Sequence, residues 1–161
     1  VITPGAAPST PTISASGEYK TTTNHGGQIT FTDYEEGIAY AKENNMPVFL
    51  DFNGFGCVNC RKMEAAVLSK PEVAEHMHKY VLISLIVDDK TKLAEPIEVE
   101  ENGKKVTLKT VGDKWSHMQR AHYQSNAQPY YVQLDAEGNR IVEGSYAYDE
   151  DIEKFLEWLK Y

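Results

Sequence analysis

Residues 48–60 read VFLDFNGFGCVNC, and this stretch decides how the chain folds. The run Val48–Asn53 is apolar except for Asp51 and Asn53, which predicts a strand that is covered on both faces. Gly54 and Gly56 favour a turn after this strand, and the chain from Cys57 to about residue 68 is compatible with a helix. The sequence therefore predicts two cysteines, Cys57 and Cys60, where a strand gives way to a helix.

The Cys-x-x-Cys spacing at such a junction indicates redox chemistry. Unpaired N–H groups and a partial positive charge at a helix N-terminus favour a thiolate at Cys57. One helical turn brings the two sulfurs within bonding distance, so Cys57 is expected to be the exposed nucleophile and Cys60 the shielded thiol that resolves a mixed disulfide. The alternative is half of a zinc site. The chain has no second cysteine pair, and His76 and His78 would point apart on a helix.

On either side of this stretch, the apolar pattern predicts strands that alternate with helices. We expect a short strand at 28–31, and then a helix that begins with a capping box of Thr32 and Glu35 and ends near Asn44–Asn45. A second capping box at Ser69–Glu72 would start another helix, and Val81–Val87 is a further buried strand. Strand, helix, strand, helix, strand implies parallel pairing with right-handed crossovers.

Residues 88–111 interrupt this alternation. Two segments of period-two polarity flank Asn102-Gly103, which is a strong hairpin signal, so we expect an inserted β-hairpin at about 95–110. The remaining expected elements are a helix over 112–123, a closing strand pair over 130–134 and 140–145, and a last helix that begins near Asp149–Asp151. The predicted fold class is α/β, with a central mixed sheet flanked by helices on both faces.

The first 27 residues differ in composition from the rest. They are rich in Ser, Thr, Pro, Gly and Ala, which predicts a flexible linker over 1–27 and one domain over 28–161. The chain starts at Val1 without a basic and apolar leader, so we expect a processed product or a fragment. No apolar run approaches the ~18 residues of a bilayer span. The net charge of −8 argues against nucleic acid or an anionic membrane as the partner.

The order of elements, Asp51 six residues before Cys57, the Cys-x-x-Cys motif and a proline at 129 together resemble the thioredoxin fold. The stretch from Asp51 to Glu64 resembles the C-terminal periplasmic domain of the transmembrane thiol:disulfide interchange protein, the DsbD type. The likeness covers about residues 28–161. Two features depart from it: Gly56 stands where thioredoxins usually place Trp, and the insertion at 88–111 is additional.

This resemblance implies a set of site residues. Cys57 and Cys60 would exchange disulfides, while Asp51 and Glu64 would manage protons and oppose thiolate formation. Pro129, following a cis bond from Gln128, would orient an extended partner, and Phe55 would supply an aromatic wall. Four of these residues also have a purely structural interpretation. Asp51 could cap a helix or take part in a turn, and Glu64 could be a solvated acid on the helix surface. Pro129 could merely start a strand, and Phe55 could leave the rim of the site open.

The resemblance also implies a function. The domain would be a protein-disulfide reductase, taking electrons from a membrane-embedded donor and passing them to extracytoplasmic proteins, with the disulfide as its only redox group and no metal. We expect a periplasmic monomer, tethered to the inner membrane in the full-length protein. A soluble disulfide oxidase or isomerase is one alternative, and a non-catalytic binding module with a structural disulfide is another.

Overall fold

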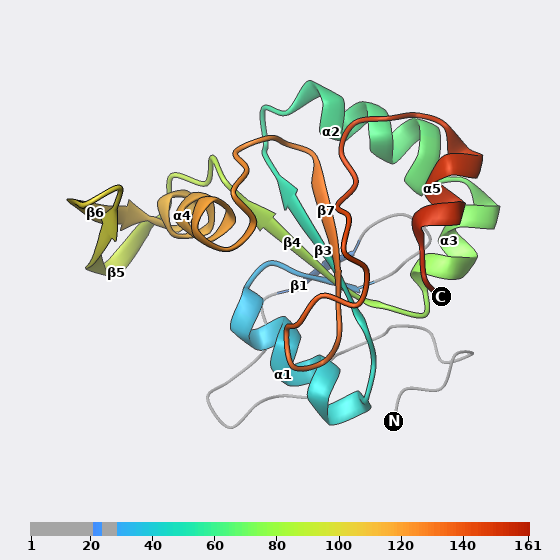
Figure 1. Ribbon diagram of the computed structural model, residues 1–161, viewed down its shortest axis with the longest axis horizontal. Coiled ribbons are helices and arrows are strands. Elements are labelled where there is room, and N and C mark those ends of the chain that lie inside the picture. The colour runs from blue at the N-terminus through green and yellow to red at the C-terminus, as the bar shows by residue number, and fades with distance from the viewer. Residues whose placement is uncertain (1–20, 24–28) are drawn as a thin grey trace.

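The computed structural model describes residues 21–23 and 29–161. Its centre is a five-stranded sheet in the order β1-β2-β4-β3-β7, and a separate two-stranded sheet pairs β5 with β6 (Figure 1). The strands are β1 (Thr21–Thr23), β2 (Ile29–Phe31), β3 (Val48–Asn53), β4 (Val81–Ile86), β5 (Lys92–Glu101), β6 (Lys104–Thr110) and β7 (Tyr130–Leu134). The helices are α1 (Tyr34–Asn44), α2 (Val58–Met63), the π-helix η2 (Glu64–Leu68), α3 (Pro71–Met77), α4 (Val111–Tyr123) and α5 (Ile152–Trp158).

The sheet is mixed, as expected. β4 runs parallel to β2 and to β3, whereas β1 and β7 are antiparallel to their neighbours β2 and β3. The pairing of β2 with β4 covers only two residue pairs, Thr30–Leu82 and Phe31–Ile83. From Ser84 onward, β4 has β3 on one side and no strand among the described residues on the other.

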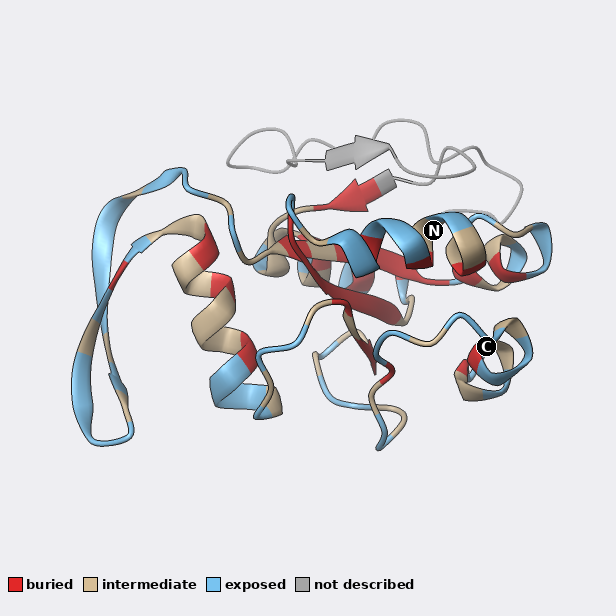
Figure 2. Cartoon of the chain, turned by 90° about the horizontal axis from the view of Figure 1, so that it is seen from above, coloured by how far each residue is buried: buried red, intermediate tan, exposed pale blue. Residues whose placement is uncertain are grey.

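Each face of the sheet carries its own core, because successive side chains of a strand point to opposite faces. One core joins Leu50, Phe52 and Ile83 to α1 and α4, where Trp115 is buried. The other joins residues of the opposite parity to α2, η2, α3 and α5; its members include Phe49, Leu82, Met63, Val67, Val73, Tyr131 and Phe155. Figure 2 shows the buried residues gathered on the strands and on the inner sides of the helices.

The inserted hairpin forms as predicted. Asn102 and Gly103 turn it with positive φ values of 52° and 77°, as a two-residue hairpin turn requires. Acidic and basic residues pair across it, Glu100 with Lys105 and Glu101 with Lys104. The hairpin lies beyond α4, at the left of Figure 1, and is mostly exposed in Figure 2. Leu108 is its buried residue.

Two helix starts differ from the prediction. The N-cap of α1 is Asp33, not Thr32, because the Asp33 side chain accepts a hydrogen bond from the Glu36 amide at 3.0 Å. Ser69 does not cap α3, since its hydroxyl donates backward to the Ala65 carbonyl and closes the preceding helix. α3 begins instead at a proline after Lys70, with no side-chain cap.

Two segments near the ends of the chain also differ from the prediction. The predicted second strand of the closing pair, 140–145, forms only isolated bridges, Leu134 with Arg140 and Tyr131 with Tyr146. The Arg140 side chain binds within this segment, to the Glu143 carbonyl and the Ser145 hydroxyl, which bends the chain away from the ladder. Most of the predicted linker over 1–27 lies outside the described residues. Its part Thr21–Thr23 is the edge strand β1, paired through its backbone with β2.

Candidate active site at the Cys57–Cys60 disulfide

Cys57 and Cys60 form a disulfide at the start of α2, with their Cα atoms 5.2 Å apart. Cys57 is the N-cap of the helix, and its sulfur accepts a hydrogen bond from the Cys60 amide at 3.1 Å. The turn before it is closed by the Cys57 amide, which donates to the Gly54 carbonyl. Cys57 is half-buried, whereas Cys60 is 0% exposed. Only one sulfur of the pair is therefore open to a partner.

Asp51 is a buried acid in β3, 6% exposed. Its Oδ2 accepts a hydrogen bond from the Asn53 amide nitrogen at 2.9 Å, and its Oδ1 accepts none of standard geometry from the described residues. Burial raises the pKa of Asp51 to about 7, because desolvation penalises the carboxylate. The Glu64 carboxylate adds to the rise of this pKa, whereas hydrogen bonding to the Asn53 and Ser84 side chains and the Arg61 charge oppose it. Asp51 can thus gain and lose a proton near neutral pH.

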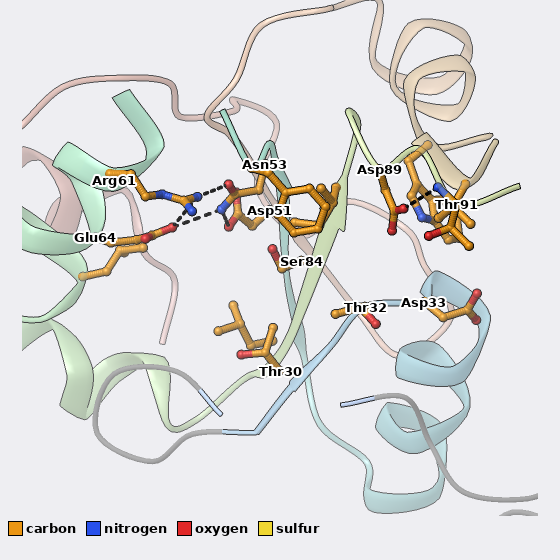
Figure 3. A pocket seen from close by; sticks show the side chains of 16 residues that line it. Thr30, Thr32, Asp33, Asp51, Asn53, Arg61, Glu64, Ser84, Asp89 and Thr91 are labelled. Atoms are coloured by element: carbon orange, nitrogen blue, oxygen red, sulfur yellow. Dashed lines mark hydrogen bonds and ion pairs between the residues drawn. The ribbon is translucent and has the colours of Figure 1, made fainter. Parts of the chain in front are cut away.

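Asn53 joins Asp51 to the first residues of the helix. The same amide nitrogen that binds Asp51 also donates to Glu64 Oε2 at 3.2 Å. Arg61 donates to the Asn53 oxygen and forms an ion pair with Glu64 at 3.1 Å. Figure 3 shows these side chains converging from β3 and from the helix. The side chain of Glu64 is 26% exposed, and the helix changes from α to π geometry at this residue.

The turn before Cys57 is held by Asp88, which follows β4. One carboxylate oxygen of Asp88 accepts from the Phe55 amide at 2.7 Å and the other from the Gly56 amide at 3.0 Å. These backbone bonds lower the pKa of Asp88 against the opposing effect of its desolvation. The side chain of Phe55 points outward and is 66% exposed, as is that of Val58. Cys57 is therefore flanked by two exposed apolar side chains.

Pro129 and Gln128 lie at the same end of the sheet. Tyr130, the next residue, pairs with Phe52 of β3, so the proline stands level with the end of the strand that leads to Cys57. The Gln128–Pro129 bond is cis, and Pro129 is buried. The Gln128 side chain donates to Gln119 at 2.8 Å, and Gln119 donates to the Ala127 carbonyl, which fixes the loop against α4.

Sequence reasoning missed three members of this site: Asn53, Arg61 and Asp88. Asn53 carried a signal, because a second polar residue two positions after Asp51 in a strand lies on the same face. Asp88 likewise stands directly after a buried strand. Within the part of the chain that the structure describes, no group of three or more potential ligands could hold a metal ion. No helix in that part is long and apolar enough to cross a membrane.

The fold and the disulfide at its strand–helix junction define a thioredoxin-fold protein. The thioredoxin-like domain family matches residues 34–161, and the chain belongs to this family. A thioredoxin from Thermus thermophilus superposes with a TM-score of 0.56 at 19% identity, over 86% of each chain. The C-terminal domain of DsbD from Neisseria meningitidis, in its reduced form, gives 0.52 at 20% identity, over 77% of this chain and 88% of that one.

A thioredoxin from Nicotiana alata gives a TM-score of 0.50 at 14% identity, over 88% of this chain and all (100%) of that one. A comparison with curated protein sequences gives no match. At such low identities, similarity between structures establishes the fold, whereas the partner proteins have to be argued from the chemistry of the site.

Proposed function

We propose that this protein is a thiol:disulfide oxidoreductase that reduces protein disulfides through Cys57 and Cys60. One observation carries the proposal: a half-buried Cys57 at a helix N-terminus is bonded to a fully buried Cys60. This arrangement supports attack by the Cys57 sulfur and resolution by the Cys60 sulfur. A purely structural disulfide needs no such difference in exposure.

The exchange takes two steps. In the reduced protein, the Cys57 thiolate attacks a partner disulfide, which forms a mixed disulfide and releases one partner thiolate. The Cys60 sulfur then attacks the Cys57 sulfur, so that the Cys57–Cys60 bond forms and the second partner thiolate leaves. Two electrons pass to the partner, and each of its thiolates takes up a proton. The reverse sequence recharges the protein from a dithiol donor.

Asp51 is proposed as the base that takes the proton of Cys60, directly or through a water. Its pKa of about 7 suits this role, because a base is most useful when its pKa lies near the working pH. Glu64 accepts a hydrogen bond from the same Asn53 amide as Asp51 and tunes the charge of Asp51. Pro129, Gln128 and the exposed Phe55 are proposed to contact the partner chain next to Cys57.

The partners are proposed to be those of a DsbD-type domain: a membrane-embedded dithiol donor and extracytoplasmic proteins with disulfides. The resemblance of the Asp51–Glu64 stretch supports this, and so does the likeness to a DsbD C-terminal domain in fold. The protein would act in the periplasm as a monomer, with its own disulfide as the only redox group. The net charge of −8 does not favour nucleic acid as a partner.

The test combines an exchange assay with a redox equilibrium. The reduced protein should reduce insulin, Cys57→Ser should abolish this activity, and Cys60→Ser should accumulate a mixed disulfide with the substrate. Insulin reduction that survives Cys57→Ser would instead identify a binding module. Equilibration with glutathione gives the reduction potential, and a strongly oxidising value would support a disulfide oxidase or isomerase in place of the reductase.

A further inference from the structure

Asn53 is the last residue of β3, and its side chain connects four neighbours. The residue is 5% exposed. The Gly54 amide donates to Asn53 Oδ1 at 2.7 Å, and the Arg61 guanidinium donates to the same atom. This atom must be the oxygen, because an amide nitrogen has no lone pair with which to accept. The nitrogen therefore lies on the other side, where it donates to Asp51 at 2.9 Å and to Glu64 at 3.2 Å (Figure 3).

These contacts use the full hydrogen-bonding capacity of the amide. A primary amide has two N–H groups to donate and an oxygen with two lone pairs, and Asn53 makes two contacts on each side. The rest of β3 is apolar except for Asp51, and a leucine would occupy nearly the same volume. A buried amide costs free energy unless its groups are bonded. The polar contacts of Asn53, and not its size, therefore distinguish it at this position.

The nitrogen of Asn53 brings two acids together. Asp51 Oδ2 and Glu64 Oε2 both lie within 3.2 Å of it. Two carboxylates this close repel each other, and the usual result is that one of them stays protonated. Desolvation contributes most to the raised pKa of Asp51, and the Asn53 hydrogen bond is the largest effect that lowers it. That hydrogen bond outweighs the repulsion from Glu64, so the amide offsets the proximity of the two acids.

We propose that Asn53 is a positioning residue that gives one N–H group to each of the two acids, so that Asp51 ionises beside Glu64 at neutral pH. The inference rests on the proposed function, in which Asp51 takes the proton of Cys60. A protonated Asp51 cannot take that proton. Without the amide, desolvation and the charge of Glu64 would keep Asp51 protonated to higher pH. Resolution of the mixed disulfide would then need more alkaline conditions.

Other groups also face Asp51. Glu64 and Arg61 act on its pKa from the helix, and the neutral Ser84 of β4 lowers it through a side-chain hydrogen bond. Tyr131 is the cross-strand partner of Asp51 in β7. Desolvation, and then the charge of Asp51, raise the pKa of this tyrosine. A neutral replacement of the asparagine leaves all of these side chains in place and adds no titrating group.

Carbon-13 NMR of the Asp51 carboxyl group in the oxidised protein measures its titration directly. Asn53→Leu removes both N–H groups, and the midpoint should rise by about one pH unit, which is a tenfold change in the protonation equilibrium. Asn53→Ser retains one donor and should shift the midpoint less. Asn44→Leu is the matched control and should leave the midpoint unchanged, because Asn44 is a buried asparagine of α1 that donates to the Tyr40 carbonyl.

The second measurement is the rate at which Cys60 resolves a preformed mixed disulfide between Cys57 and a peptide, from pH 6 to 9. At pH 7, Asn53→Leu should resolve it about fivefold more slowly than the wild type, because less Asp51 is ionised. The difference should shrink toward pH 9, where Asp51 ionises in both proteins. A merely structural role of Asn53 would slow resolution equally at every pH and leave the NMR midpoint in place.

An unchanged midpoint in a folded Asn53→Leu protein, while Asp51→Asn is slow, would overturn the role of Asn53 and leave the proposed function standing. Wild-type resolution in Asp51→Asn would instead refute Asp51 as the base, and this inference with it. If Asn53→Leu does not unfold cooperatively in urea, Asn53→Ser gives both readouts. A midpoint that rises as much in Asn44→Leu would show that the shift does not come from the shared amide, and would also overturn the proposal.

Discussion

At the scale of single residues, the site consists of acids in unequal environments. Asp51 is buried in a strand and has a pKa raised to about 7, whereas Asp88 lies at the surface and has a lowered pKa. The difference follows from what each carboxylate binds. Asp88 accepts hydrogen bonds from two backbone N–H groups, which favour its charge. Asp51 accepts one hydrogen bond from a side-chain amide and otherwise lies in a low-dielectric environment. The two carboxyl groups therefore differ in pKa because one is desolvated in a strand and the other anchors a loop by accepting backbone hydrogen bonds.

Replacing Asp51 by Asn should stabilise the protein, and more so at higher pH. The unfolded chain loses the Asp51 proton near pH 4, but the folded protein keeps it until about pH 7. Wild-type stability therefore falls as pH rises through this window, at up to about 1.4 kcal/mol per pH unit. Asp51→Asn should remove this loss, which amounts to up to about 4 kcal/mol above pH 7. Urea unfolding of both proteins at several pH values measures it, and a pH-independent difference would contradict the raised pKa.

Replacing Asp88 by Ala should loosen the turn before Cys57 with little effect on the fold. The carboxylate is exposed, so we expect a loss of about 1 kcal/mol or less in the free energy of unfolding. The amides of Phe55 and Gly56 would lose their acceptors. Their hydrogen exchange should accelerate, and alkylation of Cys57 in the reduced protein should change with it. Asp89→Ala is the control, because Asp89 binds the Thr91 amide instead.

At the scale of elements, the hairpin β5–β6 packs on α4 and not on the central sheet. Leu108 is 3% exposed, and Glu101 accepts hydrogen bonds from His117 and Arg120 of α4. Alternating polarity and Asn102-Gly103 were enough to predict the strands and the turn. They could not predict the contact with α4, because the apolar face of a hairpin does not identify the surface that covers it.

Replacing residues 94–108 by a short Gly-Ser bridge should leave a folded, redox-active protein. Lys92 pairs with Thr110, so the two ends are already adjacent, and the N-cap of α4 at Thr110 is kept. The loss of Leu108 should lower the free energy of unfolding by about 2–3 kcal/mol. Leu108→Ala in the full chain is the matched comparison. Loss of cooperative unfolding in the shortened protein would show that the fold depends on the hairpin.

At the scale of the whole molecule, local signals in the sequence predicted most of the fold, but not every segment. The mixed sheet, the hairpin and the position of both cysteines follow from apolar patterns and turn residues. The closing strand at 140–145 failed because the side chain of Arg140 binds its own segment. Thr21–Thr23 lay in a stretch whose composition suggested a linker, yet backbone pairing with β2 decides its structure. Asn53 and Arg61 act through contacts with acids that only the folded chain brings together.

The unequal exposure of the two sulfurs has a kinetic consequence. In the proposed function, every electron pair would enter and leave through Cys57, because Cys60 is fully buried. A donor and an acceptor cannot occupy that sulfur together, so each must depart before the other arrives. Steady-state turnover then follows a ping-pong scheme, in which raising one partner's concentration suppresses productive encounters with the other. The direction of flow would then be set by the reduction potentials of the two partners and by the ratio of their oxidised and reduced forms.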